Sequence, residues 1–67
     1  MQKDWIKVYR STDLYRSELL RQALIENQIE AVLVNKQGYP YNIGEVEVYV
    51  HTLNLQKAME IINKDEF

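Results

Sequence analysis

The sequence predicts an α+β fold: a truncated ferredoxin-like domain with the element order β-α-β-β-α, in which two helices cover one face of a three-stranded sheet. Two observations predict it. Three short segments, residues 5–10, 29–36 and 45–51, are rich in β-forming residues. The stretches that follow the first and the last of these segments have helical periodicity and contain no Gly or Pro.

Residues 5–10 are predicted to form the first strand because their side chains alternate. Ile6 and Val8 lie on one side, and the other side carries Trp5, Lys7 and Tyr9. A period of two is typical of a strand with one face against a core. We therefore expect Ile6 and Val8 to face the helices and the two aromatic residues to face away from them.

A helix is expected to follow residues 11–13, because the Ser, Thr and Asp there supply N-cap chemistry. Its solvent side carries Glu18, Gln22 and Glu26, and its opposite side carries Ser17, Leu20, Ala23 and Leu24. The helix should end with Asn27 or Gln28 in a left-handed conformation, for which Asn is the better suited residue.

The predicted second strand has two possible inward faces. We favour the set with Ile29, Ala31 and Leu33 over the set with Val32 and Val34. Because the run is apolar on both sides, its period does not decide between them.

The third strand has the clearest alternation in the chain. Val46, Val48 and Val50 alternate with Glu45, Glu47, Tyr49 and His51. A loop over residues 37–44, which contains both glycines and the proline, is expected before it. After it, Thr52 or Asn54 is expected to cap a last helix. That helix has its apolar positions at Leu55, Ala58, Met59 and Ile62.

The connections between the strands predict the sheet order 1-3-2. The second and third strands are joined by a loop and are expected to form an antiparallel hairpin, whereas the helical crossover makes the first and second strands parallel. Both conditions hold if the third strand lies in the middle. The first strand then lies at an edge where a complete ferredoxin-like sheet has a fourth strand. The face away from the helices is expected to carry Trp5, Tyr9, Tyr49, Val32 and Val34.

Length and composition limit the class of protein. A chain of 67 residues with 46% hydrophobic residues is expected to be one folded domain, residues 1–67. Its net charge of −2 excludes the overall attraction to nucleic acid or anionic lipid that a basic domain has. The chain has no cysteine, no signal-peptide pattern and no long apolar run. We therefore expect a cytoplasmic protein without a membrane span.

The loop offers one candidate recognition element. Tyr39 and Tyr41 flank Pro40, whose ring reduces the entropy lost when a loop is ordered by binding. The sequence allows two interpretations: the rings form a recognition tip, or they fold back over the end of the sheet.

A second candidate group lies on the third strand, where Glu45, Glu47, Tyr49 and His51 share a face. Since a strand rises about 3.3 Å per residue, Glu47 and His51 are about 13 Å apart and only the two glutamates can converge. The favoured interpretation is structural, with Glu47 paired to Lys7 on the neighbouring strand. No motif for catalysis, phosphate binding or zinc is present, so no catalytic residue, metal or cofactor is expected.

Several segments together match the pattern of a known family. They are residues 5–9 (WIKVY), 26–32 (ENQIEAV), 35–37 (NKQ) and 44–50 (GEVEVYV), with Ala58, Ile61 and Ile62. Over nearly its whole length the chain resembles the small bacterial family of putative signal-transducing proteins, a domain of unknown function. The resemblance implies a PII (GlnB-like) fold and no settled activity, and it makes loop 37–44 a shorter counterpart of the target-binding PII loop. The family prefers Gly where this chain has Gln28.

These observations predict a non-catalytic interaction or regulatory module. It is expected to form a homo-oligomer, as a dimer or trimer, or to bind another protein, through the open sheet face or the edge of the first strand. The candidate binding residues are Trp5, Tyr9, Tyr39, Tyr41, Glu45, Glu47 and Tyr49. The alternative is an RNA-binding module that stacks bases on the aromatic face. The acidic side chains on that face and the missing RNP1 pattern count against it.

Overall fold

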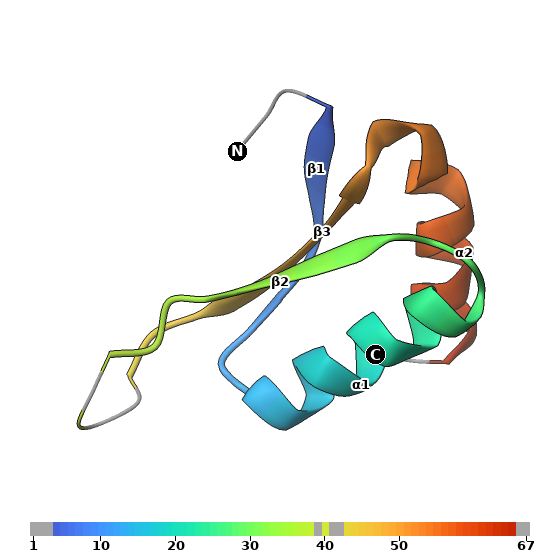
Figure 1. Ribbon diagram of the computed structural model, residues 1–67. Coiled ribbons are helices and arrows are strands. Elements are labelled where there is room, and N and C mark those ends of the chain that lie inside the picture. The colour runs from blue at the N-terminus through green and yellow to red at the C-terminus, as the bar shows by residue number, and fades with distance from the viewer. Residues whose placement is uncertain (1–3, 39, 41–42, 66–67) are drawn as a thin grey trace.

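The chain forms strands and helices in the predicted order, and the computed structural model describes residues 4–38, 40 and 43–65 (Figure 1). The elements are β1 (Trp5–Ser11), α1 (Leu14–Glu26), β2 (Ala31–Asn35), β3 (Val46–His51), the 3₁₀ helix η1 (Thr52–Asn54) and α2 (Leu55–Lys64). Neither helix in the described part of the chain has the length and apolar character needed to cross a membrane.

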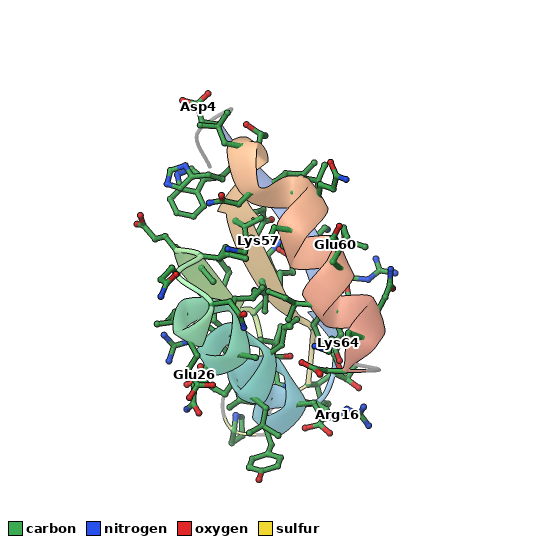
Figure 2. The ribbon with its side chains drawn as sticks, turned by 90° about the vertical axis from the view of Figure 1, so that its right-hand side faces the viewer. Asp4, Arg16, Glu26, Lys57, Glu60 and Lys64 are labelled. Carbon is green, nitrogen blue, oxygen red and sulfur yellow. The ribbon has the colours of Figure 1, made fainter. Side chains whose placement is uncertain are left out.

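The strand β3 lies between β1 and β2 and pairs antiparallel with both. The two outer strands therefore run parallel to each other at opposite edges of the sheet. Figures 1 and 2 show α1 and α2 on the same face of the sheet, and no described element covers the other face. The predicted fold class and the sheet order 1-3-2 are confirmed.

The core lies between the sheet and the two helices. Its fully or largely buried side chains are Leu20, Leu24, Ile29, Ala31, Val46, Val48, Val50, Ala58 and Ile62. Ile29 and Ala31 are buried and Leu33 packs against the core, whereas Val32 is exposed. The favoured inward face of the second strand is therefore confirmed.

The strand β1 departs from the predicted alternation at a β-bulge. Lys7 pairs with Tyr49 and Tyr9 pairs with Val48, so that Val8 is an extra residue in β1. Opposite residues of antiparallel strands share a face, and Val48 faces the core. Tyr9 therefore faces the helices and packs against the core together with Val8. The prediction that Tyr9 faces away from the helices is wrong, because the bulge reverses the parity of the residues beyond it.

The helix α1 begins at the predicted cap. The Asp13 carboxylate accepts a hydrogen bond from the Arg16 N–H at 3.2 Å, and the buried Ser17 hydroxyl donates to the Asp13 carbonyl at 2.9 Å. On the solvent side Gln22 and Glu26 are exposed, as their spacing predicts.

The C-terminus of α1 is closed by a Schellman motif. The Ile29 N–H donates to the Leu24 carbonyl and the Gln28 N–H donates to the Ile25 carbonyl, each at 2.9 Å. Gln28 has a φ of 62° and is thus the left-handed residue. The prediction that residue 27 or 28 is left-handed is confirmed. The left-handed residue is Gln28 and not the better suited Asn27, whose φ is −95°. Gln28 is also the position at which the resembled family prefers Gly.

The helix α2 follows β3 through η1. Asn54 occupies the N-cap position of α2 without a side-chain cap hydrogen bond, and the Thr52 N–H donates to the Asp4 carbonyl at 2.8 Å. Neither predicted cap therefore acts through its side chain. Of the predicted apolar positions, Ala58 and Ile62 are buried, whereas Met59 is partly exposed.

The hairpin formed by β2 and β3 continues beyond the two strands, away from the helices at the lower left of Figure 1. The Lys36 N–H donates to the Glu45 carbonyl at 2.9 Å, and Gly38 pairs with Ile43. Gly44 has a φ of 132°, and a Cβ there would lie 2.7 Å from the Lys36 carbonyl oxygen. Only glycine fits this close approach. The predicted loop 37–44 therefore contains a further antiparallel pair.

Replacement of Gln28 by Gly should stabilise the protein, because Gln28 is a non-glycine residue in the left-handed region. We expect Gln28→Gly to raise the free energy of unfolding by about 0.5–1 kcal/mol. This free energy is measured by urea denaturation, with far-ultraviolet circular dichroism as the signal. Asn27→Gly is the control and should be destabilising, since Asn27 has negative φ and its amide donates to the Ala23 carbonyl. An unchanged or lower midpoint for Gln28→Gly would contradict the prediction.

Candidate functional site

The candidate site is the sheet face opposite the helices, which we call the open face. Its residues oppose each other across the three strands: Trp5 with His51, Lys7 and Val32 with Tyr49, and Arg10 and Val34 with Glu47. Because β3 is central, each of its outward residues has a neighbour on one or both outer strands. The open face is therefore continuous across the sheet.

Glu47 lies at the centre of the open face and is nearly buried, with 4% of its surface exposed. The Tyr49 hydroxyl donates to its Oε1 at 2.9 Å. The Lys7 Nζ lies 3.2 Å from Oε2, and the Lys36 Nζ lies 3.2 Å from Oε1. A buried carboxylate is tolerated when donors satisfy its oxygens in this way. The predicted pairing of Glu47 with Lys7 is confirmed, and two further partners join it.

These donors keep the Glu47 carboxyl ionised. The hydrogen bond from Tyr49 is the largest cause. Together with Lys7 and Lys36 it outweighs desolvation, which acts in the opposite direction, and lowers the pKa of Glu47 from 4.5 to about 2. The same hydrogen bond raises the pKa of the Tyr49 phenol. At neutral pH Glu47 is thus a fixed acceptor and not a base ready to take a proton, so this arrangement favours binding over proton transfer.

A second ion pair lies nearer the hairpin. The Arg10 Nε is 3.0 Å from Glu45 Oε2, and both side chains are exposed, so the pair contributes at most about 1 kcal/mol to stability. Together with Lys7 and Lys36, Arg10 surrounds two carboxylates with three cations. The charges at this end of the open face are therefore largely paired.

The other end of the open face is aromatic. The rings of Trp5 and His51 stack with centroids 3.9 Å apart and an interplanar angle of 33°. The Glu30 Oε1 lies 3.5 Å from the His51 Nε2, and the two form an ion pair when the imidazole is protonated. Within residues 4–38, 40 and 43–65, no three His, Asp or Glu side chains are grouped so that they could hold a metal ion.

Four of the predicted binding residues lie on the same side of the sheet. Trp5, Glu45, Glu47 and Tyr49 all belong to the open face or its rim. Tyr9 lies on the opposite face, against the core. Tyr39 and Tyr41 lie outside the described residues.

Sequence reasoning did not include two of the cations at this site. Arg10 has the same parity as Ile6, so alternation places it toward the helices, and only the bulge moves it to the open face. For Lys36 a signal was present. Once Leu33 is assigned to the core, residue 36 must point outward on the same strand.

The comparison with known protein families found a match. A family model described as putative prokaryotic signal transducing protein matches residues 5–65, which is nearly the whole chain. Comparisons with curated proteins and with solved structures gave no match. The matched family is the one that the sequence resembles, whereas the implied relation to PII regulators stays a prediction.

The pH dependence of stability tests the cluster around Glu47. Because its pKa is lower in the folded protein than the ordinary 4.5, ionised Glu47 stabilises the fold above that value, and the contribution is lost as the pH falls through about 2. We expect the urea midpoint to decrease between about pH 5 and pH 2. The decrease should be smaller in Glu47→Gln, which has no carboxyl to protonate.

Tyr49→Phe is the matched variant, because it removes the largest cause of the low pKa and keeps the ring. The pKa of Glu47 should be higher in this variant, so the loss of stability should begin at a higher pH than in the wild type. Nuclear magnetic resonance titration of the Glu47 side-chain carboxyl gives the same quantity directly. Equal pH slopes for the wild type and Glu47→Gln would contradict the assignment.

Proposed function

The chain belongs to the family of putative prokaryotic signal transducing proteins. We propose that it is a small non-catalytic interaction module that self-associates through the open face. The observation that carries this proposal is the absence of any described element over that face (Figures 1 and 2). For signalling, such a module needs only to bind at one surface and to have that binding detected by another protein.

The apolar groups on the open face support burial in an interface. Trp5, Val34 and Tyr49 are half-buried and Val32 is exposed on a surface that the helices leave uncovered. Aromatic side chains contribute about 150–250 Å² each when buried, and small monomers seldom expose large apolar patches. A domain of this size also buries only about 60% of its unfolded surface. Association would therefore add stability that the single domain lacks.

The charges of the open face fit a contact between two copies. Glu47 is already desolvated and held by three donors, so covering it costs little further desolvation. Lys7 and Lys36 remain partly exposed and keep N–H groups for acceptors on the facing copy. The exposed Glu45 of each copy can serve as such an acceptor. Two sheets would then pack face to face about 10 Å apart.

The other interpretations receive less support from the geometry. The edge of β1 carries a bulge at Val8 and the charged Lys7 and Arg10, which are features that prevent strand addition. RNA binding needs aromatic rings on a cationic face. Tyr9 points away from that face, and the two carboxylates offset most of its positive charge. We therefore propose neither.

Size-exclusion chromatography with light scattering tests the self-association. Loss of one two-fold contact halves the mass of an assembly. We expect Tyr49→Lys to halve the mass, because it replaces an aromatic ring with a charge while keeping a donor near Glu47. The control is Met59→Lys on the helix side, which should keep the wild-type mass. A wild-type mass of 8.0 kDa at high micromolar concentration, or an unchanged mass in Tyr49→Lys, would overturn the proposal.

A further inference from the structure

We propose a second and separate contact between copies of this chain: the free edge of β2 pairs antiparallel with the β2 edge of a second copy, about a two-fold axis at Leu33. The sheets of the two copies would then form one continuous sheet with all helices on the same side. This contact uses backbone groups of β2, and so it goes beyond the proposed contact through the open face.

The backbone of β2 offers hydrogen-bonding groups at its outer edge. The Lys36 N–H donates to the Glu45 carbonyl, so residue 36 and the even-numbered residues of β2 point their backbone groups toward β3. The odd-numbered residues Ala31, Leu33 and Asn35 therefore point theirs outward. β2 is last in the sheet order, and no strand lies beside this edge in the described part of the chain.

The two edges of the sheet differ in how well they can accept a strand. β1 has a bulge and the charged Lys7 and Arg10. β2 reads Ala-Val-Leu-Val-Asn, pairs with β3 without a register shift, and contains no charge or proline. Regular, uncharged edges are the ones that accept another strand. The geometry thus favours β2 over β1.

Surface near the free edge of β2 is left uncovered where β2 meets α1. Two shallow hollows occur there, one lined by Ile25, Gln28, Ile29, Glu30 and Ala31, and the other by Glu18, Arg21, Ala31, Val32 and Leu33. Ile25 is 47% exposed at this position and Val32 is 36% exposed. A second copy placed against the β2 edge would lie next to both side chains, which the chain itself leaves open to water.

Charge complementarity identifies a second copy as the occupant. In antiparallel pairing centred on Leu33, Val32 lies opposite Val34, and Glu30 lies opposite Lys36 of the second copy. The two-fold axis repeats this pair at the other end. Glu30 and Lys36 have 70% and 58% of their side chains exposed, so both charges are accessible. A shift of the centre by two residues in either direction separates these charges.

A charged pair of α1 lies near the proposed axis. Glu18 and Arg21 form an ion pair on α1 and, together with Leu33, line one of the two hollows. Because these two charges are already paired, a second copy can approach them without leaving either charge unpaired.

Charge reversal in the Tyr49→Lys background tests the edge contact without the face contact. This variant is expected to remain a dimer through β2. Adding Glu30→Lys places two ammonium groups opposite each other at both ends, and the dimer dissociation constant should increase about tenfold. The double change Glu30→Lys with Lys36→Glu restores opposite charges in exchanged positions and should return the constant close to its starting value. Because Lys36 also pairs with Glu47, circular dichroism must first show that this variant is folded. Glu60→Lys on α2 makes the same charge change away from the edge (Figure 2) and should have no effect.

Amide hydrogen exchange separates this contact from the proposed function. The Leu33 amide should become protected as the protein concentration increases, whereas the Val34 amide, which points toward β3, should be protected at all concentrations. A Tyr49→Lys variant of 8.0 kDa with an unprotected Leu33 amide would overturn the edge contact and leave the face contact standing. An unchanged mass on Tyr49→Lys with a protected Leu33 amide would overturn the face contact alone.

Discussion

The burial of β3 on both of its sides is the constraint on which the rest of the structure depends. Val46, Val48 and Val50 are fully buried against the helices. On the other side Glu47 is nearly as inaccessible, although no helix covers it. Its carboxylate is held by Tyr49 on its own strand, by a lysine of β1 and by a lysine that follows β2. The helix side is thus held by apolar packing, and the open side is held by a charge cluster that ties the three strands together.

The bulge at Val8 decides the character of both sides of β1. It places Tyr9 in the core and moves Arg10 to the open face, where it pairs with Glu45. The open face therefore carries one aromatic ring fewer and one cation more than simple alternation predicts. The same bulge makes β1 an irregular edge, while β2 stays regular. The two edges of the sheet therefore differ in how readily they can pair with a further strand.

The two surfaces that we propose for self-association use different chemistry. The open face presents side chains whose charges are already paired, so it can be covered without stranding a buried charge. The β2 edge presents backbone donors and acceptors between Glu30 and Lys36. A two-fold axis through that edge is perpendicular to the sheet, and it leaves the open face accessible. Membership in the family of putative prokaryotic signal transducing proteins is consistent with recognition at such surfaces.

The sequence by itself determined the element order, the sheet order and most of the core, because periods of 2 and 3.6 and short connections are local properties. It also predicted the contact of Lys7 with Glu47, because residues of neighbouring strands that share a face can pair. The sequence alone did not predict the bulge, because an extra residue in one strand can be recognised only when the partner strand is aligned with it. Tyr9, Arg10 and the left-handed Gln28 were decided by tertiary packing, which requires Ile29 and Val48 in the core and leaves the neighbouring residues to adapt.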